Sequence, residues 1–435
     1  MSGSPALGVM GVVVLLALLL AGMPIGVGLG LVGLVGLAVT IGLEPAIIKS
    51  GVLLFETLTR YELGTLPLFM LMAHLCFAAG ASRDFFDVAA RFLGHRRGGL
   101  AIASVAGCAG FGSINGSSLA TTATIGLVAL PEMRQRGYSD ALATGSVAAG
   151  GTLGQMIPPS GALIVFGIIA EQSIGTLFTA AIIPGLTQML SYFLVIALVV
   201  AIRPGIAPRL PRVAWSERLA ALRRIIDIGV LVLIVTGGIA LGWVTPSEAA
   251  AVGATGAFLV CLLRRRLSLA TVYRALEETL KTSGLIYLVI VGALIFAAFI
   301  SVTGLTDSIG QSISGLGLGP IGTMLLVAVF LLIIGSVLDG LALMLLTTPI
   351  LLPMVTDLGL SPIWFGIFLV RAMEIGFVHP PIGMNLYVIQ GIAPDVPLGR
   401  IFKGVVPFLA ADLVHLVLLV LFPVIALGLP QWLGT

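Results

Sequence analysis

Long apolar runs, interrupted at short intervals by glycine and proline, constrain the fold of this chain more than any other feature. Of its 435 residues, 58% are hydrophobic and 9% are charged, whereas about 25% are charged in an ordinary soluble domain. This composition cannot cover a water-soluble globule with polar surface. The sequence therefore predicts an all-α polytopic membrane protein, and it excludes a nucleic-acid-binding protein, a disulfide-bonded secreted scaffold and a soluble enzyme.

The lengths of the apolar runs predict how often the chain crosses the bilayer. A crossing helix needs about 20 apolar residues, and eight segments meet that requirement singly, near 6–21, 24–42, 63–80, 183–202, 226–244, 247–263, 283–304 and 404–428. Segments 141–170 and 361–392 are longer crossings, each broken by a Pro-Pro pair. Segments 98–131 and 320–356 are too long for one crossing and too short for two. The prediction is therefore ten spans plus two re-entrant hairpins.

Basic residues indicate the orientation of these crossings. With the crossings placed as above, 19 of the 22 lysines and arginines face one side, which the positive-inside rule makes cytoplasmic. Lys49 and Arg60 face the other side, and Arg371 lies inside a crossing. Both termini are then periplasmic, and the basic amphipathic runs 82–97 and 268–281 are expected to lie as helices on the cytoplasmic surface. No basic region precedes the first apolar run, which favours a retained first helix over a cleaved signal peptide.

Prolines recur at a fixed spacing, which indicates an internal repeat. Four pairs are each 222 positions apart: Pro24 and Pro246, Pro131 and Pro353, Pro158 and Pro380, and Pro159 and Pro381. We therefore divide the chain into a first repeat, 1–202, a cytoplasmic linker, 203–225, and a second repeat, 226–435. Each repeat contains five crossings, an odd number, so the second repeat is predicted to be inverted relative to the first. Inverted repeats with paired broken helices are typical of secondary transporters, which bind their solutes near the breaks.

Polar side chains are concentrated in the first predicted hairpin, in the stretch GSINGSSLATTAT of 112–124. The glycines around Ser113, Asn115 and Ser117 permit the tight backbone of a hairpin tip. Such irregular backbone occurs at membrane depth only where it is buried in protein or lines a cavity. Uncharged carbonyl and hydroxyl oxygens suit a monovalent hard cation such as sodium. For the threonines of 121–124, close helix packing is an equally good explanation.

The first broken crossing contains GTLGQMIPPSG, residues 151–161. Proline removes backbone donors and frees carbonyl groups, so the break exposes oxygen ligands and a helix N-terminus at mid-membrane. Ser160 begins the second half-helix. Its hydroxyl is available either to cap that helix or to contact a solute.

In the second half, Asp339 stands 222 positions after Ser117. A carboxylate at membrane depth is costly and indicates function; it could neutralise a bound cation or relay a proton. The alternative is a structural partner for an arginine, but no basic residue is near it in sequence. In the second broken crossing, Asn385 is a candidate ligand and His379 a candidate anion donor or titrating group.

The remaining buried charges are expected to be structural. Arg371 and Glu374 are three positions apart and are predicted to pair, and so are Asp412 and His415. The sequence contains no nucleophile–base arrangement, Walker loop or metal-spaced cysteine and histidine cluster. Neither an enzyme nor an ATP-driven pump is therefore expected.

Four stretches together carry a family resemblance: GSINGSSLATTATIG (112–126), GTLGQMIPPS (151–160), GSVLD (335–339) and EIGFVHPPIGMNLYV (374–388). The chain resembles, over essentially its whole length, the large membrane subunit of tripartite ATP-independent periplasmic (TRAP) transporters. The resemblance implies an elevator-type fold of the ion transporter superfamily in the bacterial inner membrane. It also implies two partners, a small four-helix membrane subunit and a periplasmic substrate-binding protein. Family substrates are mostly organic acids, and sodium is the usual coupling ion.

The resemblance also implies roles for individual residues. Sodium ligands are expected at the two hairpins and breaks, at Ser113, Asn115, Ser117, Gly154, Asp339, Thr347, Gly376 and His379. The solute is expected beside Ser118, Pro159, Ser160, Pro381 and Asn385. Two positions depart from the family pattern: His379 stands where threonine is frequent, and Asn115 where serine is common. His379 therefore leaves room for proton coupling.

The sequence as a whole predicts secondary active, sodium-coupled uptake of an anionic organic solute, with no cofactor other than the coupling ion. The closest alternative is a stand-alone sodium- or proton-coupled carboxylate or ion transporter of the same superfamily that needs no binding protein. A channel or scaffold subunit is a more distant alternative, because it leaves the paired hairpins, the paired breaks and Asp339 without a function.

Overall fold

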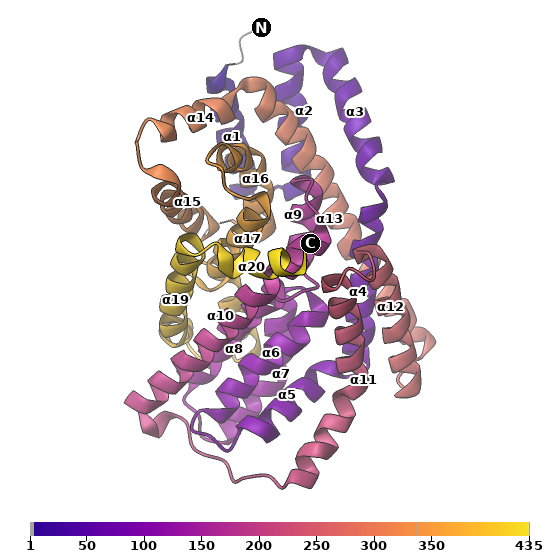
Figure 1. Cartoon of the computed structure of the whole chain (residues 1–435), viewed down its shortest axis with the longest axis vertical. Helices are drawn as coiled ribbons and strands as arrows, with labels where there is room; N and C mark the ends of the chain where they lie inside the picture. The colour runs from indigo at the N-terminus through magenta and orange to yellow at the C-terminus, as the bar shows by residue number, and fades with distance from the viewer. Residues whose placement is uncertain (1–3, 337, 435) are drawn as a thin grey trace.

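The computed structural model describes residues 4–336 and 338–434. Within those residues the chain forms twenty α-helices, two short 3-10 helices and no strand, which confirms the all-α prediction (Figure 1). Residues 1–3, at the start of the predicted retained N-terminus, lie outside the described residues, and so does Val337 of the second predicted hairpin.

Eleven helical elements make up the first half of the chain. They are α1 (Pro5–Leu20), α2 (Ile25–Ile41), α3 (Leu43–Thr59), η1 (Tyr61–Gly64), α4 (Thr65–Ala78), α5 (Ala81–Leu93), α6 (Gly99–Asn115), α7 (Ser118–Gln135), α8 (Asp140–Met156), α9 (Gly161–Ile169) and α10 (Ile174–Ile202).

The second half follows a similar order. Its elements are η2 (Pro204–Ile206), α11 (Trp215–Ala240), α12 (Pro246–Leu263), α13 (Leu269–Thr303), α14 (Leu305–Ser314), α15 (Gly319–Gly335), α16 (Gly340–Asp357), α17 (Pro362–Val378), α18 (Met384–Ile392), α19 (Leu398–Leu421) and α20 (Val424–Leu433).

The spacing of the prolines recurs in the helix boundaries and in the packing. Helices α7 and α16 begin 222 positions apart, and so do α8 and α17. By the same spacing α2 corresponds to α12, and α4 corresponds to the second part of α13. In the structure α2 packs against α13, and α4 packs against α12. The contact between α2 and α13 therefore repeats the contact between α12 and α4. Two halves related by a pseudo-twofold axis would pack in this way.

Six helical segments are long and apolar enough to cross a membrane: Tyr61–Ala78, α10, α12, α13, α16 and α19. A seventh is formed if α8 and α9, which meet at a bend of 41°, are taken as one broken span. Shorter apolar helices include α1, α2, α6 and α15. The chain is thus a multi-pass helical protein, and the count of ten crossings stays a prediction.

Four segments differ from the sequence-based expectation. A helix not predicted, α3, follows Gly42, and most of its side chains are exposed. The predicted surface helix 268–281 and the crossing 283–304 form one continuous helix, α13, because no proline interrupts it and Ser268 caps its N-terminus. The last crossing, predicted over 404–428, ends at Leu421, because Pro423 separates α19 from α20.

The predicted linker 203–225 is shorter in the structure, because α11 begins at Trp215. The ring of Trp215 packs edge-on against Phe92 of α5 at 6.3 Å. The guanidinium of Arg218 lies 5.8 Å from the centre of the Phe92 ring. These contacts hold the first turns of α11 against α5, where the sequence alone suggested a connector.

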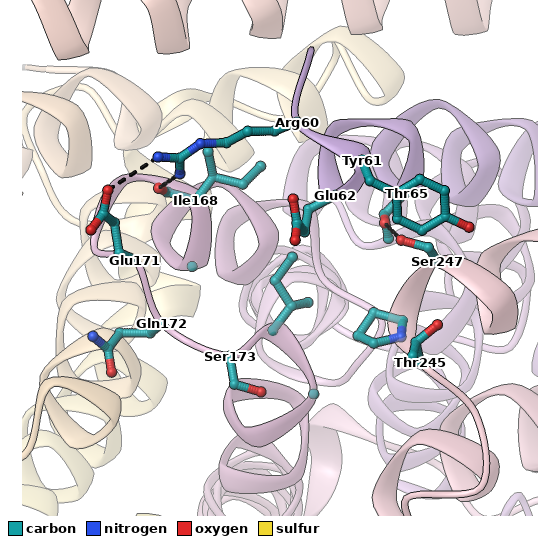
Figure 2. A pocket seen from close by; sticks show the side chains of 14 residues that line it. Arg60, Tyr61, Glu62, Thr65, Ile168, Glu171, Gln172, Ser173, Thr245 and Ser247 are labelled. Carbon is teal, nitrogen blue, oxygen red and sulfur yellow. Dashed lines mark hydrogen bonds and ion pairs between the residues drawn. The ribbon is translucent and has the colours of Figure 1, made fainter. Parts of the chain in front are cut away.

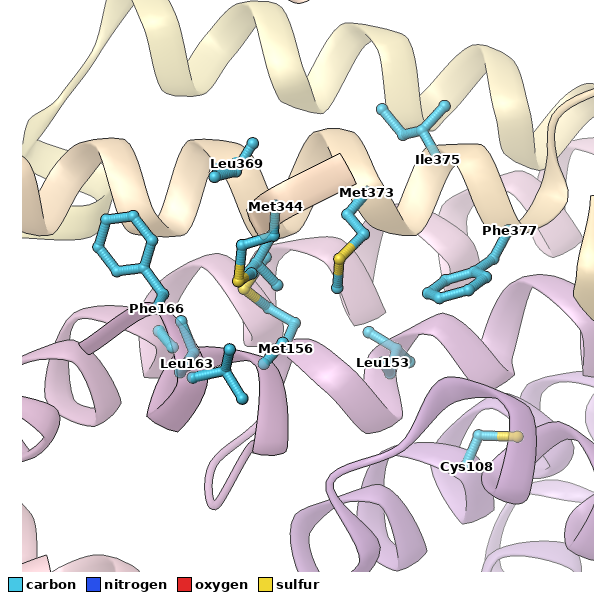
Figure 3. Close-up of a cluster of buried hydrophobic side chains, with 14 of the residues drawn as sticks. Cys108, Leu153, Met156, Leu163, Phe166, Met344, Leu369, Met373, Ile375 and Phe377 are labelled. Carbon is cyan, nitrogen blue, oxygen red and sulfur yellow. The ribbon is translucent and has the colours of Figure 1, made fainter. Parts of the chain in front are cut away.

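The core near the helix breaks consists of apolar side chains from both halves (Figure 3). Met156 and Phe166, on either side of the first break, face Met344 of α16 and Met373 of α17. All four are buried. Methionine is unbranched and fills irregular gaps, which suits packing around two interrupted helices.

A buried ionic cluster joins α17 to α19. The predicted pair of Arg371 and Glu374 is confirmed, with Nη1 2.9 Å from Oε2. The predicted pair of Asp412 and His415 is wrong, because Arg371 bonds to both: Nη2 donates to Asp412 Oδ1, and Nε donates to His415 Nδ1 at 3.1 Å. The other ring nitrogen of His415 then donates to Thr187 Oγ1 of α10 at 2.9 Å. Four of these side chains are essentially inaccessible, and the cluster joins three helices, with α10 reached through His415.

Replacing Arg371 by methionine is expected to destabilise the protein strongly. The change leaves the carboxylates of Glu374 and Asp412 buried without their cation, which typically costs about 3–5 kcal/mol. Thermal unfolding of the detergent-purified protein would measure the loss. Arg60→Met is the matched control, because its ion pair with Glu171 is largely exposed and should contribute about 0–1 kcal/mol. Equal melting temperatures for the two variants would contradict the role of the cluster.

Candidate ion and solute site

The tip of the first hairpin lies directly against the first helix break. Helix α6 ends at Asn115, and Gly116 adopts a left-handed conformation with φ of 64°. The Gly161 N–H, at the start of α9, donates to the Gly116 carbonyl at 3.4 Å. A Cβ at Gly116 would lie 2.8 Å from the Pro159 carbonyl oxygen. The contact therefore requires glycine at 116 both for its backbone angle and for its lack of a side chain.

The structure brings most of the predicted ligands of the first ion site together. Ser117 caps α7, its Oγ accepting the Ala120 N–H at 3.4 Å. Asn115 Nδ2 donates to Thr121 Oγ1 at 3.5 Å. A Cβ at Gly154 would lie 2.4 Å from Thr121 Oγ1 and 2.9 Å from the Ser117 carbonyl oxygen. Polar groups of α6 and α7 thus lie close to Gly154 of α8.

Ser113 lies one turn earlier on α6 and is 6% exposed. Its hydroxyl donates to the Gly110 carbonyl at 2.7 Å, so its oxygen lone pairs remain available. Whether Ser113 binds an ion stays a prediction.

Ser160 and Pro159 form the first break and are both buried. Ser160 caps α9, its Oγ accepting the Leu163 N–H at 3.4 Å, so the capping function anticipated from the sequence is present. A second function in solute binding stays a prediction. The peptide bonds Pro158-Pro159 and Pro380-Pro381 are both cis.

At the tip of the second hairpin, as at the tip of the first, a side chain caps the helix that follows. Asp339 caps α16, its Oδ2 accepting the Leu341 N–H at 3.0 Å. A Cβ at Gly376 of α17 would lie 2.6 Å from the Gly335 carbonyl oxygen. Asp339 and Gly376 line a cavity of about 30 Å³, together with Ser336. A cavity of this size accepts one water molecule or one small ion, and it is too small for an organic solute.

Three predicted residues lie apart from this small cavity. Thr347 is two turns further along α16, donates to the Leu343 carbonyl at 2.7 Å and lines a different, apolar cavity. His379 ends α17 and is half-buried, and its Nδ1 has no partner among the residues that the structure describes. Pro381 is exposed.

The predicted solute residues Ser118 and Asn385 are in direct contact. Asn385 Nδ2 donates to Ser118 Oγ at 3.0 Å and to the Ala148 carbonyl of α8 at 3.0 Å. Asn385 is fully buried and Ser118 nearly so. The first hairpin is thereby linked to the second broken helix through two polar side chains 267 positions apart.

A much larger cavity, of about 640 Å³, lies between η1 and α12 on one side and the α9–α10 connection on the other (Figure 2). Arg60 Nη2 donates to Glu171 Oε1 at 3.1 Å, and its Nη1 donates to the Ile168 carbonyl at 3.4 Å. On the opposite wall, the hydroxyls of Thr65 and Ser247 bond to each other at 2.6 Å. No predicted ligand lines this cavity.

The sequence did not single out several of these residues. Ser336 and Gln155 lie within stretches that the sequence identified as candidates. A polar side chain inside an apolar run was the signal that could have singled them out. The Gln155 Oε1 is buried without a partner among the described residues. Arg60 and Glu171 are 111 positions apart, so no sequence pattern connects them.

Comparisons with known proteins agree on one family. A family model described as "Tripartite ATP-independent periplasmic transporter, DctM component" matches residues 12–425. The C4-dicarboxylate TRAP transporter large permease protein DctM of Pseudomonas aeruginosa is 37% identical over 92% of this chain and 94% of its own length. The sialic acid TRAP transporter large permease protein SiaM of Vibrio cholerae is 31% identical, over 96% of each chain.

Two further relatives extend the comparison. The ectoine TRAP transporter large permease protein TeaC of Halomonas elongata is 29% identical, over 96% of this chain and 97% of its own length. Among solved structures, the YdaH transporter of Alcanivorax borkumensis superimposes with a TM-score of 0.60 at 15% identity, over 90% of this chain and 89% of that one. At that identity the likeness concerns the fold alone.

Gly154→Ala is expected to separate the first hairpin from α8. The new methyl group would overlap Thr121 Oγ1 and approach the Ser117 carbonyl, and such overpacking typically costs about 1–3 kcal/mol. The control is Gly284→Ala in α13, where nothing lies within 4 Å of the added Cβ and alanine should favour the helix slightly. Thermal unfolding of both variants distinguishes them; an unchanged melting temperature for Gly154→Ala would show that the tip does not pack there.

Proposed function

Since the chain belongs to the DctM family of tripartite ATP-independent periplasmic transporters, we propose that it drives sodium-coupled uptake of an anionic organic solute. It is the large, multi-pass permease subunit of such a system. The proposed partners are a small four-helix membrane subunit and a periplasmic substrate-binding protein that delivers the solute. The proposed location is the bacterial inner membrane, with both termini in the periplasm.

One observation carries the proposal: each hairpin tip is packed against a broken crossing, close to the break. Gly116 contacts Pro159 and Gly161 at the first break, and the Gly335 carbonyl contacts Gly376 next to the second. Both contacts depend on glycine, so the two tips are held close to helix ends that expose backbone oxygen and N–H groups. Such discontinuous helices provide ion and solute sites in secondary transporters.

Sodium is the proposed coupling ion at both tips. Around the first tip, Asn115, Ser117 and Gly154 supply uncharged oxygens, with Thr121 as an addition from the structure. At the second tip, the carboxylate of Asp339 lines a cavity of about 30 Å³. A cation bound there would neutralise this carboxylate and reduce the cost of a second carboxylate, that of the solute, at membrane depth. Ion binding and solute binding would then favour one another.

The proposed solute position lies between the two tips, beside Ser118, Ser160 and Asn385. A carboxylate is the proposed anionic group, because Ser160 Oγ accepts the Leu163 N–H and keeps its own O–H to donate, and because two relatives are named for C4-dicarboxylate and sialic acid. Transport by an elevator motion is part of the proposal. In that motion the exposed pair of Arg60 and Glu171 is a contact that can break at little cost.

A sodium-specific rise in melting temperature is the first expected result. A ligand that binds only the native state at a hundredfold excess over Kd adds about 2.7 kcal/mol, so sodium should stabilise the purified chain more than potassium or choline at equal ionic strength. Asp339→Asn should reduce this response. Asp307→Asn, an exposed carboxylate on α14, is the control and should leave it unchanged. Equal responses to all three cations would rule out sodium coupling and direct attention to protons at His379 and Asp339.

Uptake by the reconstituted tripartite system is the second test. Asn385→Leu removes the bonds to Ser118 and Ala148, and loss of polar recognition at a buried site should lower uptake of labelled succinate by roughly tenfold or more. Gln311→Leu, at an exposed position on α14, should retain wild-type uptake. Full sodium-driven uptake without any binding protein would instead favour a stand-alone transporter.

A further inference from the structure

A basic cavity of about 770 Å³ lies where α5, α7 and α11 meet the end of α12. These labels lie together in the lower part of Figure 1. Five arginines and two aspartates are among the lining residues: Arg83, Arg223, Arg224, Arg264, Arg266, Asp84 and Asp227. All five arginines belong to the set that the positive-inside rule assigns to the cytoplasm. None of these residues takes part in the ion and solute site.

One arginine forms ion pairs with both carboxylates that line the cavity. Arg264 is 17% exposed and donates through Nη1 to Asp84 Oδ2 at 2.5 Å and through Nε to Asp227 Oδ2 at 2.8 Å. Its Nη1 also donates to the Ala79 carbonyl at 3.1 Å. Arg264 is therefore a fixed part of the wall, and the acids it binds are not available to neutralise the other arginines.

The positive charges of the other four arginines are not fully neutralised by carboxylates. Arg83, Arg223 and Arg266 are exposed and form no ion pair within residues 4–336 and 338–434. Arg224 lies 3.9 Å from Asp87, whose two oxygens already accept the Nε–H of Arg91 at 3.0 Å. Exposed guanidinium groups around one cavity form a site for an anion, and phosphate matches their paired N–H groups well.

The cavity also has an apolar wall. Phe77 at the end of α4 is 52% exposed, and Leu127 on α7 is 63% exposed; both line the cavity together with Val128. A free phosphate ion has no apolar surface to bury, so such a wall does not strengthen its binding. A phospholipid gains from both sides of the cavity, because its phosphate can meet the arginines while an acyl chain covers the apolar residues.

We propose that this cavity binds the phosphate group of an anionic phospholipid from the cytoplasmic leaflet. Basic pockets between membrane helices on the cytoplasmic side recognise anionic head groups in this way. The inference uses the cytoplasmic orientation given above, but it does not depend on sodium coupling or on the identity of the solute. The bound head group would contact α7 of the first hairpin as well as α5 and α11, so the lipid would join the hairpin to the helices around it.

Native mass spectrometry of the detergent-purified full chain tests the proposal with phosphatidylglycerol and phosphatidylcholine of identical acyl chains. Each arginine near a membrane surface strengthens the binding of an anionic lipid, so retention should favour phosphatidylglycerol by roughly tenfold or more. The triple variant Arg83→Gln, Arg223→Gln, Arg266→Gln should lose this preference. The control removes the same charge from exposed linker positions outside the cavity, through Arg203→Gln, Arg209→Gln and Arg212→Gln.

Leu127→Ser separates the two possible sources of phosphate. It should weaken retention of phosphatidylglycerol but leave stabilisation by inorganic phosphate unchanged, and its exposed position makes folding secure if the triple variant fails to fold. Equal retention of phosphatidylglycerol by both triple variants would overturn the proposal, and so would equal retention of both lipids by the wild type. Stabilisation by inorganic phosphate as strong as by the lipid, with no effect of Leu127→Ser, would assign the cavity to a soluble anion instead. A lipid preference that persists in Asp339→Asn shows that this result is independent of the ion site.

Discussion

The rest of the structure depends on the contact between each hairpin tip and a broken crossing. In an apolar surrounding, backbone groups freed at a break must find partners within the chain. The Gly161 N–H bonds to the Gly116 carbonyl at the first break, and Gly376 approaches the Gly335 carbonyl near the second. Only glycine permits these approaches, so the residues that hold the tips in place also keep polar backbone concentrated at two points.

Charges in the chain serve two different purposes. The cluster around Arg371 is fully buried and joins α17, α19 and α10, so it contributes rigidity next to the second break. Pairs at the surface, such as Arg60 with Glu171, are exposed and can open and close at little cost. The five arginines that line the basic cavity belong to neither group, because most of them have no carboxylate partner within the described residues. This surplus of positive charge beside an apolar wall led to the lipid proposal.

Much of the fold could be predicted because local signals set it. Apolar length and the Pro-Pro pairs predicted breaks between α8 and α9 and between α17 and α18, and helices end at those places. One error arose where a helix boundary depends on packing: α11 begins at Trp215, whose ring packs against Phe92 of α5. Of the predicted site, Asp339 and Gly376 share a cavity, whereas Thr347 lies elsewhere because two turns of α16 separate it from the tip.

The sequence by itself determined the all-α membrane class, the 222-residue spacing of the prolines, the family and the stretches that contain the candidate site. Composition, the spacing of residues and the positions of helix-breaking residues can be read directly from the order of residues along the chain. The tertiary structure alone decided that Arg371 binds Asp412, that Asn385 binds Ser118, and that five arginines surround one cavity. Such pairings depend on how each helix is rotated and packed against another, and side chains 41 or 267 positions apart meet only after that packing is complete.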